Sequence, residues 1–299
     1  GNDVGIAAPG ADKFFFSTLP FEALVDGTGD NTRTEFMDRM LTDYFGLFAP
    51  SGDTAITMDV NLYTGWNMLS FPITLDDPDV NTVFPSRIGD VYWFNPASAA
   101  YEAISTVSPG QGFFVLIPAD ETISISGMPV EYYAIDGGLG WNQIGAVMPD
   151  SLFYSHIGLD DPASLVGSIY SYNAMSGAYM SEVYMKAPYA YWALLSADSE
   201  IRVPAEGGDD LLKTAPESEY AIALNGSAIQ LAKGDNYVDC IPPVLPDGTG
   251  RSSIYIDAQF PAQKMANPSG IFTVVVEEDG IATISGGSLI IDGKPADET

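Results

Sequence analysis

The feature that most constrains this chain is an internal repeat. The segment 65–70, Gly-Trp-Asn-Met-Leu-Ser, recurs 75 residues later as Gly-Trp-Asn-Gln-Ile-Gly. Three further blocks recur in the same order at an offset of 78 residues: 91–95 with 169–173, 112–115 with 190–193, and 119–125 with 197–203. Four matched blocks in one order, with a single three-residue drift, indicate a duplicated unit. We therefore expect two copies of one small structure, with other segments before and after them.

Each copy has the pattern of β-structure. Short runs rich in aromatic and β-branched residues, such as 91–94 and 113–117, alternate with clusters of Gly, Pro, Asn and Ser. One helical turn is expected per copy, at 79–84 and at 162–166. An Asp-Asp-Pro sequence precedes each turn, and aspartate before a proline is typical of a helix start.

The segments outside the copies differ in character. Residues 1–57 contain a buried-strand pattern followed by an amphipathic helix. This order is typical of α/β proteins, although one such unit is too small to bury both faces of its strand. After the Gly- and Asp-rich linker 206–210, short strands at roughly ten-residue spacing indicate a small β-sandwich, and 276–281 is interpreted as a hairpin with an Asp-Gly turn. The predicted fold is mainly β, divided into a strand-helix segment, two β repeats and a C-terminal sandwich, at 1–57, 58–130, 131–205 and 206–299.

The charge balance excludes some partners. The chain has 40 acidic and 11 basic residues, a net charge of −29, although only 17% of its residues are charged. Nucleic acid needs a basic footprint that this chain lacks. No run approaches the roughly 18 apolar residues of a membrane span, so no membrane insertion is expected. The acidity is spread over all parts of the chain, which favours an extracellular or cell-surface protein that remains soluble in salt.

Cysteine and histidine counts exclude much chemistry. The single cysteine, Cys240, allows no internal disulfide, and with the single histidine, His156, no Cys/His zinc site can form. His156 lies in no nucleophile motif and is expected to be structural or exposed, whereas Cys240 is expected in a core. Forty carboxylates always allow an acid pair, but nothing selects one, so we do not expect an enzyme.

A few residues are candidate site residues. The loop 26–31 alternates oxygen donors with glycines, so Asp26 and Asp30 are calcium candidates, with a solvated turn as the alternative. The Asp-Asp-Pro sequences add further calcium candidates, for which helix capping is the competing interpretation: Asp76, Asp77, Asp160 and Asp161. No other cofactor is indicated.

The tryptophans separate into two kinds. Trp66 and Trp141 occupy the same position in both copies and are expected in the core. Trp93 has Ser171 as its counterpart, which makes Trp93 the better candidate for ligand binding.

These patterns resemble known families. The sequences at 65–72, 91–101 and 109–115 resemble β-rich Gly-Trp-Asn repeats of large secreted or cell-surface bacterial proteins, although the second copy has Pro-Tyr-Ala-Tyr where the first has Pro-Gly-x-Gly. The stretch 253–292 is similar to the immunoglobulin-like β-sandwiches that close such proteins. The first 47 residues resemble the C-terminal tail of a flavodoxin-like domain of the glutamine-amidotransferase-like kind, which accompanies secreted peptidases. The resemblance supplies no catalytic residues.

Three functions remain open from the sequence. The first is a non-catalytic extracellular or cell-surface structural module that assembles through β-edges into a filament or layer, with itself or other extracellular proteins as partners. The second is a carbohydrate-binding or adhesion module that uses aromatic rings to bind glycans. The third is the non-catalytic C-terminal part of a secreted peptidase-like protein.

Overall fold

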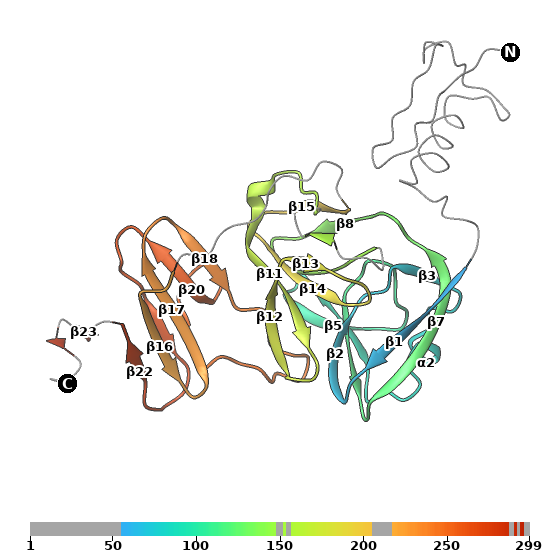
Figure 1. The fold of residues 1–299 in the computed structure, drawn as a ribbon, viewed down its shortest axis with the longest axis horizontal. Helices are drawn as coiled ribbons and strands as arrows, with labels where there is room; N and C mark the ends of the chain where they lie inside the picture. The colour runs from blue at the N-terminus through green and yellow to red at the C-terminus, as the bar shows by residue number, and fades with distance from the viewer. Residues whose placement is uncertain are drawn as a thin grey trace, which may run out of the picture. The chain divides into compact units, whose positions relative to one another are not determined.

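The structure is a computed structural model that describes residues 55–147, 152–153, 157–204, 217–286, 290–291 and 294–295 (Figure 1). It is mainly β, as predicted. The predicted strand-helix unit lies outside the described residues except for its last three positions, and so does His156. In the described part of the chain, no helix is long and apolar enough to cross a membrane.

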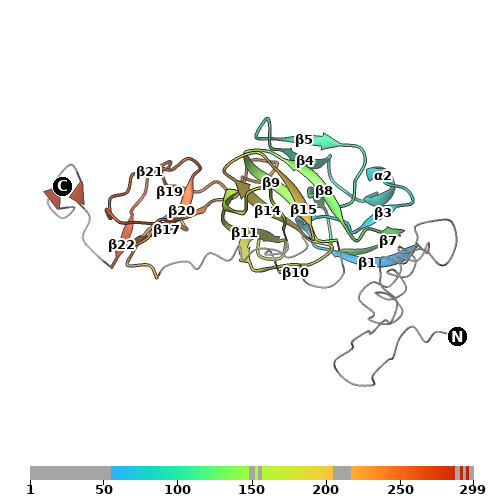
Figure 2. The same cartoon turned by 90° about the horizontal axis from the view of Figure 1, so that it is seen from above.

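The first repeat consists of two antiparallel sheets. Its four-stranded sheet has the order β2-β6-β4-β5, and its three-stranded sheet has the order β1-β7-β3 (Figure 2). Side chains from both sheets pack into one apolar cluster that includes Val60, Phe71 and Phe113. The strands are β1 (Ile56–Leu62), β2 (Gly65–Leu69), β3 (Ile73–Leu75), β4 (Val91–Asn95), β5 (Ala100–Ile104), β6 (Phe113–Ile117) and β7 (Glu121–Pro129), and the expected helical turn is α2 (Val80–Val83).

The second repeat has the same plan and the same register. Its four-stranded sheet has the order β12-β11-β14-β9, and β15 pairs with β8. Trp66 lies opposite Leu116 in the first copy, and Trp141 lies opposite Leu194 in the second. The predicted duplication is therefore confirmed at the level of residue pairs. The elements are β8 (Tyr133–Gly137), β9 (Gly140–Gly145), β10 (Leu152–Phe153), the 3₁₀ turn η4 (Pro162–Ser164), β11 (Leu165–Asn173), β12 (Ala178–Glu182), β13 (Tyr184–Met185), β14 (Ala190–Leu195) and β15 (Ser199–Val203).

The Gly-Trp-Asn motif closes the turn before the second strand of each copy. Gly65 and Gly140 have φ values of 101° and 104°, a region that glycine adopts without strain. The amide of Asn67 donates to the carbonyls of Tyr63 and Gly65 at 2.7 and 3.0 Å and accepts from the Tyr63 N–H at 3.0 Å. Asn142 makes the same three bonds in the second copy. The motif recurs because it satisfies the buried backbone of this turn.

The two copies pack against each other about a pseudo-two-fold axis. A backbone bridge joins Leu69 to Tyr189, and a second joins Gln111 to Ile144. Leu69 is the counterpart of Ile144, and Gln111 is the counterpart of Tyr189, so the two bridges are reciprocal. This reciprocity is the property of an isologous interface, here formed inside one chain.

Aromatic rings follow the same symmetry. The ring centroids of Phe94 and Trp192 lie 5.0 Å apart, and those of their counterparts, Tyr172 and Phe114, lie 5.7 Å apart. Both pairs are edge-to-face, an arrangement that the ring quadrupoles favour. The two repeats thus share one aromatic core, to which Trp66 and Trp141 contribute as predicted, with exposed fractions of 9% and 7%.

The C-terminal strands form one hydrogen-bonded sheet of order β21-β19-β20-β17-β16-β22, in which β18 also pairs with β20. The pair β17–β20 is parallel and the others are antiparallel. Cys240 is buried, as predicted, and burial raises the pKa of its thiol to about 12. The strands are β16 (Tyr220–Leu224), β17 (Ser227–Lys233), β18 (Tyr237–Cys240), β19 (Ile254–Ile256), β20 (Ala262–Asn267), β21 (Val274–Val276) and β22 (Thr283–Ser285), followed by the short pair β23 (Ile290–Ile291) and β24 (Lys294–Pro295).

The predicted hairpin at 276–281 is wrong. Strand β21 pairs with β19, and β22 pairs with β16, so the two strands lie at opposite edges of the sheet. The chain bends at Gly280, but the two flanking strands pair with different strands of the sheet. Long-range pairing overrides the local turn signal here.

A proline-rich segment joins the C-terminal sheet to both repeats. The phenols of Tyr101 and Tyr179, which are counterparts, donate to the carbonyls of Val244 and Pro243, each at 2.8 Å. The indole N–H of Trp66 donates to the Asp247 carboxylate at 2.9 Å. We call residues 243–247 the docking segment.

Candidate ligand-binding cleft

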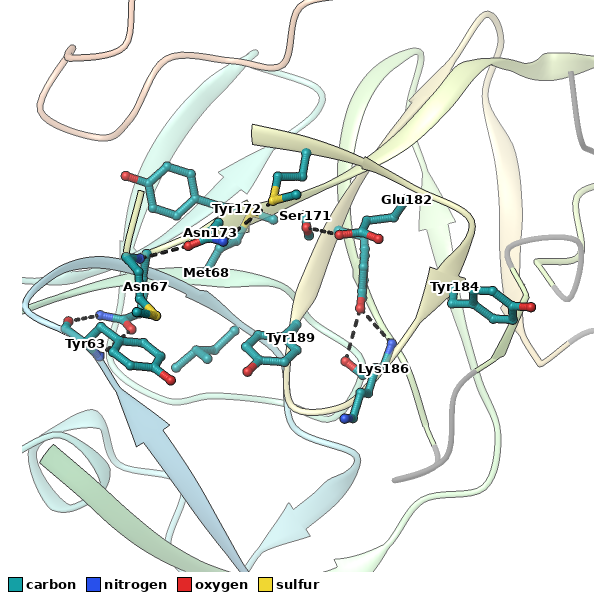
Figure 3. A pocket seen from close by; sticks show the side chains of 15 residues that line it. Tyr63, Asn67, Met68, Ser171, Tyr172, Asn173, Glu182, Tyr184, Lys186 and Tyr189 are labelled. Atoms are coloured by element: carbon teal, nitrogen blue, oxygen red, sulfur yellow. Dashed lines mark hydrogen bonds between the residues drawn. The ribbon is translucent and has the colours of Figure 1, made fainter. Parts of the chain in front are cut away.

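A cleft of about 370 Å³ lies where the two repeats cross (Figure 3). One wall comes from the turn after β1 and from β2 in the first repeat, and the other comes from the β11–β12 hairpin and the segment from β13 to β14 in the second. This volume falls in the range of small-molecule sites. The lining residues are Tyr63, Asn67, Met68, Leu69, Ser171, Tyr172, Asn173, Ala174, Met175, Met180, Glu182, Tyr184, Lys186, Tyr189 and Tyr191.

Tyrosine rings give the cleft its character. Tyr191 is buried, its hydroxyl accepts from the Lys186 N–H at 2.7 Å, and burial raises its pKa to about 12. The pKa of Tyr189 is also raised, first by burial and then by the neighbouring phenol of Tyr63. Both phenols are therefore neutral at physiological pH, and that of Tyr191 also donates to the Lys186 carbonyl at 3.3 Å.

Polar groups on the second repeat complete the lining. The Ser171 hydroxyl donates to the Glu182 carboxylate at 2.7 Å, which fixes the position of that side chain. The side-chain carbonyl of Asn173 accepts from the backbone N–H of Met175 at 3.0 Å. In the view of Figure 3, Tyr63, Tyr189 and Lys186 lie along one side of the cleft, and Ser171 and Glu182 lie on the other.

The duplication provides an internal comparison for this cleft. The residues that build its frame have similar counterparts in the other copy: Asn67 and Asn142, Leu69 and Ile144, Tyr172 and Phe94, Asn173 and Asn95. Tyr191 also keeps an aromatic counterpart, Phe113. Five other lining positions differ in kind between the copies: Tyr63 and Gly138, Ser171 and Trp93, Glu182 and Ile104, Lys186 and Ser108, Tyr189 and Gln111. The frame has been kept while the lining has diverged.

At the pseudo-equivalent crossing, the counterpart residues make different contacts. Gln143, the counterpart of Met68, accepts there from the Phe94 N–H at 3.0 Å. The backbone at Gly138 approaches Pro96 so closely that a Cβ on this glycine would lie 3.0 Å from the proline Cβ. A side chain at this position would require Pro96 to shift.

The structure places the predicted ligand residue Trp93 away from the cleft. Trp93 is half-buried on β4 opposite Glu102, and its counterpart Ser171 is the residue that lines the cleft. Of this pair of counterpart positions, the cleft is lined by the smaller residue, Ser171, and not by Trp93. A ligand role for Trp93 itself stays a prediction.

One calcium candidate of the first copy, Asp77, takes part in the start of the helical turn. Asp79 caps α2 by accepting from the Asn81 N–H at 2.7 Å, and Asp77 accepts from the Asp79 N–H at 3.1 Å. These bonds lower the pKa of Asp79, the bond from the Asn81 backbone most of all. Asp76 is exposed beside them. The cap of this turn is thus Asp79, two positions after the aspartate that the sequence suggested.

In the second copy the predicted cap is confirmed. Asp161 accepts from the Ala163 N–H at 2.9 Å at the start of η4. Asp160 pairs with Arg202 at 3.0 Å, and this hydrogen bond is the main cause of its lowered pKa. Asp26 and Asp30 lie outside the described residues. Within the ranges that the structure describes, no three His, Cys, Asp or Glu side chains group as a metal site would require.

The aromatic and charged residues of the cleft were not predicted from the sequence. The available signal was the set of positions at which the two copies disagree, since Tyr63, Glu182, Lys186 and Tyr189 all belong to it. Their convergence depends on how the copies cross, which an offset between repeats does not reveal. Comparison of the chain with models of known families, with curated proteins and with solved structures gives no match.

Proposed function

We propose that this chain is a non-catalytic module of an extracellular or cell-surface protein and that it binds a carbohydrate in the cleft between its repeats. The observation that carries the proposal is the divergence of the cleft lining on a frame that both copies share. Sugars present apolar C–H faces and hydroxyl groups together, and tyrosine rings beside amide and carboxylate groups complement both.

The number of carboxyl groups in the cleft favours a binding role over hydrolysis. Glycoside hydrolysis uses two carboxyl groups flanking the scissile bond, about 5–9 Å apart. Glu182 is the one acidic residue among the described residues that line the cleft. Its carboxylate already accepts a hydrogen bond from Ser171.

Assembly through β-edges has weaker support than ligand binding. Strands β2 and β9 are the edges of the two four-stranded sheets at the crossing, and the opposite edges are β5 and β12, which are counterparts. Each is five residues long and carries a glutamate, Glu102 or Glu182. Short edge strands with charged side chains are features that oppose the addition of further strands.

A glycan array followed by calorimetry on its hits tests the proposal. Tyr189→Ala removes a ring from the cleft, and we expect binding to weaken on the order of tenfold, as for the loss of one stacking contact. Gln111→Ala is the matched control, because it alters the counterpart position in the other copy and should leave binding unchanged. Absence of binding to every glycan on the array, or equal loss in both variants, would refute the proposed function.

A further inference from the structure

The repeats contain very few basic side chains, and two of them already have hydrogen-bond or ion-pair partners. Residues 58–205 include three basic residues, Arg87, Lys186 and Arg202. Arg202 pairs with Asp160 at 3.0 Å and with Glu200 at 2.8 Å. Its positive charge is therefore offset by two carboxylates on its own surface.

Arg87 has a structural role at the helical turn. Its guanidinium donates to the carbonyls of Val80 and Phe84 at 3.2 and 3.1 Å, and to the side-chain oxygen of Asn81 at 2.8 Å. Both carbonyls also accept backbone bonds, from the N–H of Phe84 and of Arg87, so the guanidinium reinforces a turn that is already hydrogen-bonded. Arg87 is thus committed to this turn.

Lys186 differs from both arginines. Its side chain is exposed and lines the cleft, and no carboxylate of the described residues lies within ion-pairing distance of its ammonium group. The counterpart in the other copy is Ser108, so the cation belongs to the diverged lining and not to the shared frame. The chain has a net charge of −29, yet among the described residues this cation has no carboxylate partner and it faces the cleft.

The neighbours of Lys186 extend the set of donors. Tyr63 and Tyr189 line the same side of the cleft, and their phenols are close enough for Tyr63 to raise the pKa of Tyr189 further. A neutral phenol can donate a hydrogen bond to an anion, and an ammonium group offers three donors. The one carboxylate of the cleft, Glu182, is on the opposite side and accepts from Ser171.

We propose that the cleft selects an acidic sugar, a uronic acid whose carboxylate binds the Lys186 ammonium group beside the hydroxyls of Tyr63 and Tyr189. The inference rests on the proposed function and adds the chemical class of the ligand. A chain of this charge repels anions at long range, but at physiological salt that repulsion is screened beyond about 8 Å. Contact with a local cation then decides whether an anionic sugar stays bound.

The test uses the full chain and three immobilised polysaccharides, polygalacturonate, alginate and hyaluronan, each beside its carboxyl-reduced counterpart. Carboxyl reduction replaces the uronic acid with the neutral hexose and leaves the remaining structure unchanged. We expect at least one native polymer to bind on the order of tenfold more tightly than its reduced form, as a charge-assisted contact allows. Lys186→Ser, which introduces the residue of the other copy, should abolish this preference, and Lys186→Arg should retain it.

Lys233→Ser is the control, since this exposed lysine lies on β17 of the C-terminal sheet and its removal changes the net charge by the same amount. Equal binding of native and reduced polymers would overturn the inference and leave carbohydrate binding intact. A preference that persists in Lys186→Ser, or that Lys233→Ser also abolishes, would overturn the role of Lys186. Binding of neither form of any polymer overturns the inference, and the glycan array then decides separately whether the proposed function stands.

Discussion

Asn67 and Asn142 show how one side chain fixes a turn in each copy. Each is 3% exposed and satisfies one backbone donor and two backbone acceptors of the turn before the second strand. The neighbouring position is reinforced in the same way, because Asp120 and Asp198 accept from the N–H of Thr64 and Leu139, each at 2.7 Å. The turn geometry is thus held mainly by side chains that bond backbone groups, and Asp120 in addition accepts from the Thr64 hydroxyl at 2.7 Å.

Removal of such an asparagine should destabilise the fold. We expect Asn142→Ala to lower the free energy of unfolding by about 3 kcal/mol, because it leaves buried backbone groups without partners. Asn61→Ala is the control, since Asn61 is exposed on β1 and its side chain accepts a single bond from Thr122. Urea unfolding of both variants provides the measurement. A loss from Asn142→Ala no larger than that of the control would show that the turn does not depend on this side chain.

At this scale the sequence predicted burial better than it predicted roles. Trp66, Trp141 and Cys240 are in the core as expected, because large apolar or soft side chains at repeated positions have few other places to lie. The role of the motif asparagine could not be predicted, since its partners are backbone atoms of neighbouring residues and leave no mark in residue identity.

Among the elements, the strands β2, β9 and their neighbours bring counterpart residues into direct contact at the pseudo-two-fold axis. A Cβ on Gly112 would lie 3.0 Å from the Cβ of its counterpart Ala190. A Cβ on Gly145 would overlap the hydroxyl of its own counterpart, Ser70. Close to the axis there is therefore room for only one side chain of each counterpart pair. In both pairs one residue is glycine and the other has a side chain: Gly112 with Ala190, and Gly145 with Ser70.

This arrangement predicts strong coupling between the members of a pair. Gly145→Ala should destabilise the chain by about 1–3 kcal/mol through overpacking, since the site is fully enclosed. The double variant Gly145→Ala with Ser70→Gly should recover most of that loss, because it moves the side chain to the other partner. A double-mutant cycle from urea unfolding measures the coupling. Additive effects would show that the two positions do not share this space.

The elements themselves were largely predictable. The paired strands of the repeats and both helical turns follow from alternation and capping patterns, which act over a few residues. The hairpin at 276–281 was not, because β21 and β22 pair with strands that lie far away in the sequence. Local signals locate a turn, but the choice of strand partner depends on which sheet edges the rest of the fold leaves open.

For the molecule as a whole, buried and partly buried tyrosines connect the two repeats and the C-terminal sheet. Tyr101 and Tyr179 reach the docking segment from the two repeats, and Tyr170 donates from β11 to the Asp239 carboxylate on β18. The cleft likewise depends on both repeats, so the sequence of one copy contains only half of it. Its location could not be predicted, because the duplication reveals which residues are counterparts and not which residues meet.

The same tyrosines predict how the molecule responds to alkali. Burial is the first cause that raises the pKa of Tyr101, Tyr170 and Tyr179, and the pKa of Tyr191 rises to about 12. A tyrosine in the unfolded chain ionises near pH 10. Between about pH 10 and 12 the unfolded state therefore loses protons that the native state keeps, so the free energy of unfolding falls as the pH rises, whereas below pH 10 the contribution is fully present.

We expect cooperative unfolding in this alkaline window, followed by circular dichroism together with tyrosinate absorbance. Exposed tyrosines should ionise first without a change in the near-ultraviolet signal, and the buried ones should ionise together with its loss. The variant Tyr101→Phe with Tyr179→Phe removes two ionisable groups, so its stability should fall less steeply with pH, although it loses two bonds to the docking segment and starts lower at neutral pH. Complete tyrosine ionisation while the near-ultraviolet signal is still native would contradict this account, because it would mean that the phenols joining the three parts of the fold can carry charge without separating them.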